Sequence, residues 1–82
     1  MTKDIFLLGS TGSIGSTTLN ILKKDKKNFR IKLLTTHSNI KKIYKQALLF
    51  NVNKILIFNK KEFLKNYKKF EKKKISVFCT IG

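Results

Sequence analysis

Three glycines at three-residue intervals separate an apolar run from the start of a helical pattern, and they constrain the fold more than any other feature of the chain. Gly9, Gly12 and Gly15 follow the run at residues 5–8 and are three of the four glycines in the sequence. In a nucleotide-binding strand–turn–helix unit, the first glycine permits a sharp turn, the second lets the backbone approach a pyrophosphate, and the third lets helix and strand pack closely. The spacing therefore predicts a phosphate-binding turn at residues 9–15.

The helix after this turn is expected to complete an anion site. Its first N–H groups have no partners within the helix, and the helix dipole brings positive charge to the same end. The hydroxyls of Ser10, Thr11 and Ser13 offer further donors. An ATP-type P-loop is excluded, because that motif requires a lysine after its last glycine and Ser16 stands there. A tight strand-to-helix turn without a ligand is the structural alternative.

Apolar runs and helical patterns alternate along the chain. Strands are expected at residues 4–8, 29–36, 54–58 and 75–81, with amphipathic helices beginning near residues 13, 38 and 59. This alternation predicts an α/β fold, a Rossmann-like parallel sheet with alternating helices. Helical spacing predicts that the following side chains face the sheet: Ile14, Thr18, Ile21 and Leu22 in the first helix, Ile40, Ile43, Tyr44, Ala47 and Leu48 in the second, and Phe63, Tyr67 and Phe70 in the third.

The last expected strand indicates that this fold is incomplete. Parallel sheets are normally buried on both faces, whereas the apolar residues 75–79 have no following element to cover them. We therefore expect residues 1–82 to be the N-terminal part of a larger dinucleotide-binding domain, with the catalytic and C-terminal domains absent. A fragment, a truncated product and one piece of a split protein are equally compatible with this expectation.

The chain is strongly basic, with 19 basic and 4 acidic residues and a formal charge of +15. This charge attracts polyanions without regard to sequence, so non-specific nucleic-acid contact is expected. A dedicated nucleic-acid-binding chain is the alternative function, although Arg30 is the only arginine and no nucleic-acid motif is present. No apolar run is long enough to span a bilayer and no leader precedes the first strand, so a bacterial cytoplasmic location is expected.

The residues after the second expected strand bear on the choice of cofactor. NAD-binding proteins commonly carry an Asp or Glu there that accepts hydrogen bonds from the ribose. Residues 35–39 contain no carboxylate, and Lys41 and Lys42 follow closely. A 2′-phosphate suits such a site, so the pattern favours NADPH. His37 is either an exposed loop histidine or a contact to the adenosine phosphate.

The side chains that could take part in catalysis are few and are dispersed along the sequence. The only carboxylates are Asp4, Asp25, Glu62 and Glu71, and the chain has one histidine and one cysteine. These residues form no acid–base pair, catalytic triad or metal-ligand cluster. We therefore expect no catalytic and no metal-binding residue within this sequence.

The stretch from Ile5 to Leu19 is more specific than a generic glycine motif. It reads Ile-Phe-Leu-Leu-Gly-Ser-Thr-Gly-Ser-Ile-Gly-Ser-Thr-Thr-Leu, and it resembles the N-terminus of the 1-deoxy-D-xylulose 5-phosphate reductoisomerase family, in which LGSTGSIG and a nearby TL pair open the NADPH-binding domain. The likeness continues strongly to Asn39 and more loosely to Phe58.

This resemblance implies an NADP-dependent oxidoreductase and isomerase of the non-mevalonate isoprenoid pathway. Such an enzyme reduces a rearranged sugar phosphate to 2-C-methyl-D-erythritol 4-phosphate with Mg²⁺ or Mn²⁺ and is a homodimer. A plastid-like compartment is the alternative location. The resemblance implies NADPH contacts at Thr11, Gly12, Ser13 and Ile14 and at His37, Ser38 and Asn39.

One position departs from the family pattern. The family commonly has Gly-Lys-Asn where this chain has His37-Ser38-Asn39, so Lys41 or Lys42 would have to supply the missing cation. The family's metal carboxylates and substrate-phosphate residues have no counterpart here, which implies a chain that is inactive alone. A decayed remnant without function is the remaining alternative.

Overall fold

The described part of the chain, residues 3–79 of the computed structural model, alternates strands with helices. The strands are β1 (Lys3–Leu7), β2 (Phe29–Thr36), β3 (Lys54–Ile57) and β4 (Ser76–Cys79). The helices are α1 (Ser13–Lys23), α2 (Ile40–Phe50) and α3 (Lys60–Glu71). The predicted order of elements is confirmed. The end of the last predicted strand, residues 80–81, lies outside the described residues.

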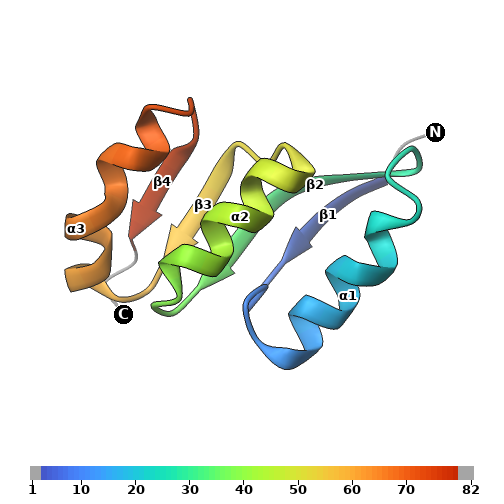
Figure 1. Ribbon diagram of the computed structural model, residues 1–82, viewed down its shortest axis with the longest axis horizontal. Coiled ribbons are helices and arrows are strands. Elements are labelled where there is room, and N and C mark those ends of the chain that lie inside the picture. The colour runs from blue at the N-terminus through green and yellow to red at the C-terminus, as the bar shows by residue number, and fades with distance from the viewer. Residues whose placement is uncertain (1–2, 80–82) are drawn as a thin grey trace.

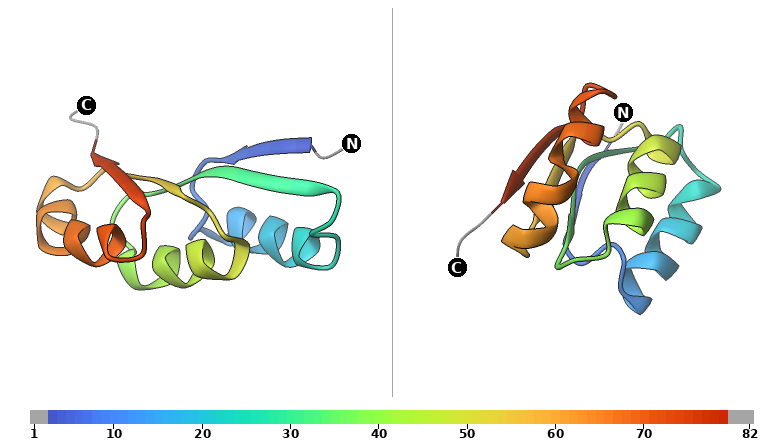
Figure 2. Two further views of the ribbon diagram at one scale, coloured as in Figure 1. Left: turned by 90° about the horizontal axis from the view of Figure 1, so that it is seen from above. Right: turned by 60° about the vertical axis from the view of Figure 1, so that its left-hand side comes forward.

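The strands form one parallel sheet in the order β1-β2-β3-β4 (Figure 1). Each strand therefore pairs with the next one in sequence, and each connection is a helix. Connections of one hand that always step in the same direction leave their helices on the same face of the sheet. Figure 2 shows this directly, because α1, α2 and α3 all lie on one side of the strands. The predicted Rossmann-like parallel sheet is confirmed.

The core lies between the sheet and these helices. Leu34 and Ile55 face each other in adjacent strands and are fully buried, as is Ile43 of α2. Phe70 of α3 is also fully buried, and its ring meets the ring of Tyr44 edge-on with centroids 5.3 Å apart. These contacts fix α2 and α3 against the middle of the sheet, which positions the loops at its ends.

Asparagine residues cap the starts of α2 and α3 and the end of α2. The Asn39 side chain accepts a hydrogen bond from the Lys42 N–H at the start of α2, and the Asn59 side chain accepts one from the Glu62 N–H at the start of α3. Asn51 ends α2 in the left-handed conformation, with φ of 55°. Such caps satisfy backbone groups that the helix leaves unpaired.

The prediction of the buried face of α1 is confirmed for Leu22 and wrong for Ile14 and Ile21. Gly15, Leu19 and Leu22 are buried, whereas Ile14 and Ile21 are 85% and 65% exposed. Two neighbouring faces of α1, one residue apart, both carry apolar side chains. Gly15 decides which face is buried, because it lets α1 approach the turn after β1 closely. In α2, Leu48 is likewise exposed, contrary to the helical pattern.

The second face of the sheet has no helix over it within residues 3–79 (Figure 2). Phe6 of β1 and Phe78 of β4 lie on this face and are 64% and 52% exposed. Leu33 and Leu56 lie between them and are half-buried. The uncovered face agrees with the expectation of an incomplete α/β fold. No helix in residues 3–79 is long and apolar enough to cross a membrane.

Candidate functional site

The glycine turn lies at the carboxyl end of β1, the same edge of the sheet at which β2 ends and α2 begins (Figure 1). Gly9 has φ of +68°, a conformation that strongly favours glycine. The Gly12 N–H donates to the Gly9 carbonyl at 3.1 Å and closes the turn. Beside it is an open surface pocket of about 440 Å³, lined by Leu7, Leu8, Gly9, Gly12, Ser13, Ile14 and Gly15.

Gly15 is required by the packing of the protein itself. A Cβ at this position would lie 2.3 Å from the Gly9 carbonyl oxygen and 2.7 Å from the Ser10 Cα. Both of these atoms belong to the backbone, so a side chain here would push α1 away from the turn. The role of the third glycine, close packing of the helix on the strand end, is confirmed.

Gly12 differs from Gly15 in this respect. A Cβ at Gly12 would meet only the Gly9 carbonyl oxygen, at an ordinary contact distance of 3.5 Å. Its φ of −76° and ψ of 176° are open to any residue, and it is exposed. Nothing in the described part of the chain therefore requires glycine at this position.

The N-terminus of α1 is open toward the pocket. Gly12 is the N-cap and provides no side-chain hydrogen bond, and the first turn contains no acidic residue. Helix N–H groups without such a cap, together with the positive end of the dipole, attract an anion. The geometry of the turn thus suits a phosphate group.

The glycine turn is tied to the end of β2 by hydrogen bonds. The Gly9 N–H donates to the Thr35 hydroxyl at 2.7 Å, and the hydroxyls of Thr11 and Thr36 lie 2.7 Å apart. Thr36 also accepts a hydrogen bond from the Asn39 N–H at 3.2 Å. Through Thr36, the structure brings together the two stretches that the sequence predicted as a site, residues 9–15 and 37–39.

Three exposed residues, His37, Ser38 and Asn39, form the loop between β2 and α2. Lys42 follows in the first turn of α2, and its Nζ donates to the Thr11 carbonyl at 3.1 Å. A positive charge therefore lies between the glycine turn and this loop. Of the two lysines that the sequence offered, Lys42 is the one in contact with the turn.

Ser10 is placed differently from its neighbours. It is fully buried, and its hydroxyl donates to the Gln46 side chain at 2.8 Å, so it points into the protein and not toward the pocket. The sequence-based expectation that this hydroxyl is a donor to a ligand does not agree with that position. Gln46, Thr35 and Thr36 were not predicted. Gln46 is the only residue of α2 with an amide side chain, among lysines and apolar residues. This contrast is the feature of the sequence from which its role could have been predicted.

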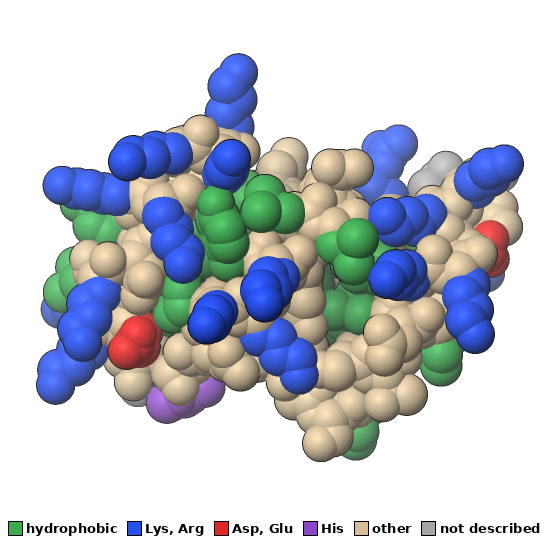
Figure 3. Space-filling view, in the orientation of Figure 1, with side chains coloured by type: hydrophobic (Ala, Val, Ile, Leu, Met, Phe, Trp, Pro, Cys, Tyr) green, Lys and Arg blue, Asp and Glu red, His purple; other side chains and the backbone are tan. Residues whose placement is uncertain are grey.

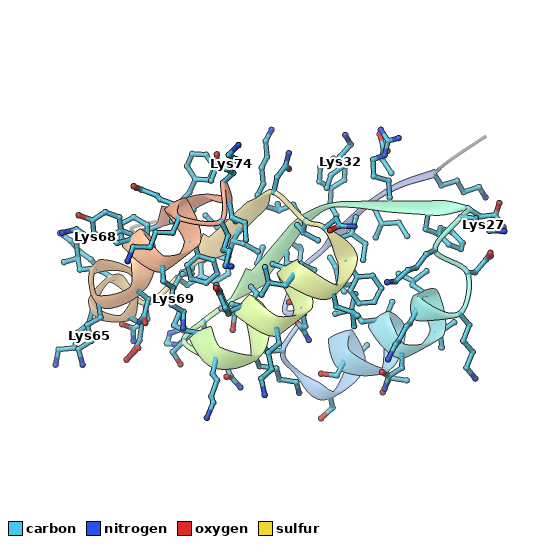
Figure 4. All side chains as sticks on the ribbon, turned by 45° about the horizontal axis from the view of Figure 1, so that its top comes forward. Lys27, Lys32, Lys65, Lys68, Lys69 and Lys74 are labelled. Atoms are coloured by element: carbon cyan, nitrogen blue, oxygen red, sulfur yellow. The ribbon has the colours of Figure 1, made fainter. Side chains whose placement is uncertain are left out.

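Lysines are scattered over the molecule. Figure 3 shows them over most of the visible face except its lower edge, and in Figure 4 the labelled lysines project from several different elements. Lys69, for example, lies over the Tyr44 ring at 4.6 Å, where it packs against the protein. This distribution favours a solvated basic surface over one nucleic-acid interface. In residues 3–79, no group of three or more His, Cys, Asp or Glu side chains could hold a metal ion.

Comparison with known proteins gives one consistent result. The family model for 1-deoxy-D-xylulose 5-phosphate reductoisomerase matches residues 5–82. The reductoisomerase of Pelagibacter ubique is 47% identical over 76 residues, which are 93% of this chain and 20% of that protein. The reductoisomerase of Wolbachia from Brugia malayi is 42% identical over 59 residues, 72% of this chain and 15% of the relative.

Solved structures agree with this result. The reductoisomerase of Zymomonas mobilis in complex with NADPH superposes with a TM-score of 0.89 over 96% of this chain and 21% of that one, at 20% identity, which supports the fold. A reductoisomerase in complex with magnesium gives a TM-score of 0.84 at 26% identity, over 98% of this chain and 20% of that one. The chain spans about a fifth of the length of these proteins.

Proposed function

Because the chain belongs to the 1-deoxy-D-xylulose 5-phosphate reductoisomerase family, we propose that its residues bind the NADPH used by that enzyme. The family is one of NADPH-dependent oxidoreductases. This region is the start of its NADPH-binding domain, and the glycine turn at the sheet edge is the proposed cofactor site.

The observation that carries the proposal is the contrast between Gly12 and Gly15. A side chain at Gly15 would collide with the backbone, so packing alone explains that glycine. A side chain at Gly12 would collide with nothing in residues 3–79, so packing does not explain this one. A ligand that approaches the backbone at Gly12 does explain it, and a pyrophosphate at the open N-terminus of α1 is such a ligand.

The proposed contacts follow from the position of each residue. We assign the pyrophosphate to the open turn and the helix start, at Gly9, Thr11, Gly12, Ser13, Ile14 and Gly15. The adenosine ribose and its phosphate are assigned to the loop at His37, Ser38 and Asn39. Ser10 supports the turn from inside, because its hydroxyl is used by Gln46.

Charge near the loop supports NADPH over NADH. No carboxylate stands at residues 37–39, so nothing there repels a 2′-phosphate. Lys42 brings an ammonium to the Thr11 carbonyl, next to this loop. A phosphate paired with an ammonium forms a charge-assisted hydrogen bond, which NADH cannot match.

When bound, NADPH supplies the hydride for reduction, and the residues of this chain bind and orient it. The remaining features of the family are proposals for the complete native polypeptide: a phosphorylated sugar substrate, homodimer assembly and a bacterial cytoplasmic location. The Mg²⁺ or Mn²⁺ of the family would be held by residues outside 3–79, given the lack of a ligand cluster within them.

Titration of the complete native polypeptide with NADPH and NADH, at low and at high salt, tests the proposal. The +15 charge attracts any anion at low salt, and high salt screens such exposed contacts. We expect saturable NADPH binding that survives high salt and is tighter than NADH binding. Equal affinity for the two cofactors, or NADPH binding that vanishes with salt, would contradict it.

A further inference from the structure

Gln46 contacts the glycine turn from α2, although 36 residues separate it from Ser10. Its Nε2 donates to the Ser10 carbonyl at 2.9 Å. The Ser10 hydroxyl donates to the Gln46 Oε1 at 2.8 Å. One amide side chain thus makes two hydrogen bonds to one residue of the turn.

These bonds are partly shielded from solvent. Ser10 is fully buried and Gln46 is half-buried. The Ser10 N–H is also used, because it donates to the Thr35 carbonyl at 2.9 Å. Loss of the Gln46 amide would leave the Ser10 carbonyl with only the Ser16 hydroxyl, at 3.5 Å, as a donor. Weakening the hydrogen bonding of a buried carbonyl in this way is costly.

The bond to the carbonyl fixes the orientation of a whole peptide group. The Ser10 carbonyl and the Thr11 N–H belong to the same planar peptide, and in a trans peptide they point in opposite directions. With the carbonyl held inward by Gln46, the Thr11 N–H is directed away from the protein interior. Within residues 3–79, that N–H donates no hydrogen bond.

We propose that Gln46 is a positioning residue for the cofactor site, which holds the Ser10–Thr11 peptide so that the Thr11 N–H faces the pyrophosphate. The inference rests on the proposed function, because it needs NADPH or NADH to occupy the turn. Gln46 itself does not touch the cofactor. Gln46 should therefore affect the binding of the pyrophosphate, which NADPH and NADH share, and not the binding of the 2′-phosphate.

The test replaces Gln46 with leucine in the complete native polypeptide and measures the Kd for NADPH and for NADH well below the melting temperature. We expect Gln46→Leu to weaken both cofactors by the same factor, about tenfold, the size expected from one or two hydrogen bonds. Asn66→Leu is the matched control, because Asn66 is also a half-buried amide within a helix but bonds only to Glu62.

Two further variants separate the two hydrogen bonds. Gln46→Glu keeps the acceptor for the Ser10 hydroxyl but loses the donor to the carbonyl, so it should weaken binding as much as leucine does. Ser10→Ala removes the hydroxyl but keeps the Gln46 bond to the carbonyl, so it should weaken both cofactors less than Gln46→Leu does. Ser10→Ala also tests the proposal if Gln46→Leu fails to fold.

Several outcomes would overturn the proposal. A lower melting temperature for Gln46→Leu with both Kd values unchanged would mean that Gln46 has only a structural role. If Gln46→Leu weakens NADPH but not NADH, Gln46 acts on the 2′-phosphate and not on the pyrophosphate. If Ser10→Ala weakens both cofactors as much as Gln46→Leu does, the bond to the Ser10 carbonyl does not account for the effect. If the unsubstituted polypeptide binds neither cofactor, the proposed function itself fails.

Discussion

The hydroxyl oxygens of Thr11 and Thr36 lie 2.7 Å apart and join the glycine turn to the end of β2. Thr36 is 1% exposed and also accepts the Asn39 N–H, so one buried hydroxyl links the turn to the loop before α2. Thr36 is therefore one side chain that contacts both parts of the proposed cofactor site. The relative position of the pyrophosphate and the adenosine ribose would follow from it.

Thr36→Val tests this link, because valine has nearly the same shape and lacks the hydroxyl. We expect a loss of about 1–2 kcal/mol in the free energy of unfolding, from two hydrogen bonds to a buried group, together with weaker NADPH binding. Chemical denaturation and cofactor titration measure the two effects. Thr17→Val is the control, since Thr17 is exposed and bonds only within α1. Equal effects of Thr36→Val and Thr17→Val would mean that the Thr36 hydroxyl has no special role in the proposed cofactor site.

Gly15→Ala tests the close packing of α1 on the turn. The added methyl group would lie 2.3 Å from the Gly9 carbonyl oxygen. Overpacking against backbone costs about 1–3 kcal/mol, which exceeds the roughly 1 kcal/mol that alanine gains over glycine within a helix. Thermal unfolding should therefore show a lower melting temperature. An unchanged or raised melting temperature would mean that α1 sits farther from the turn than the structure has it.

Lys42→Met tests the choice of cofactor. The ammonium of Lys42 lies at the turn, whereas Lys41 is exposed on the same helix and has no recorded contact with the turn in the described residues. We expect Lys42→Met to raise the Kd for NADPH about tenfold and to leave NADH nearly unchanged, because a charge-assisted hydrogen bond is lost. Lys41→Met, which removes the same charge from the molecule, should change neither. If both variants weaken NADPH equally, general charge and not Lys42 determines the preference.

Local patterns in the sequence predicted most of the fold. Alternating apolar runs placed the strands and helices. These features depend on neighbours within one turn of helix or a few residues of strand. The glycine turn belongs to the same class, because its spacing directly reflects its geometry.

Features set by distant contacts were not predictable in this way. Periodicity alone could not choose between the α1 face that contains Ile14, Ile21 and Leu22 and the face that contains Leu19 and Leu22, because both carry apolar side chains. The choice depends on how closely Gly15 approaches the turn, and that distance is a tertiary property. Gln46 and Thr36 contact the turn from 36 and 25 residues away, so no local pattern shows which residues of the turn they support.

The most direct test of the account is Gly12→Asp, because it should abolish NADPH binding without lowering the stability of the protein. Asp is a favoured N-cap, α1 has no acidic residue in its first turn, and a Cβ fits at this position. The free energy of unfolding should therefore stay the same or rise. A carboxylate beside the proposed pyrophosphate would crowd and repel it. Gly12→Asn, similar in shape but uncharged, separates these two effects.

The measurement is the Kd for NADPH of Gly12→Asp in the complete native polypeptide, with its melting temperature determined in parallel. The account predicts a folded protein, at least as stable as the unsubstituted one, that no longer binds NADPH. Unchanged NADPH affinity in that folded variant would contradict it, because the pyrophosphate would then lie away from Gly12.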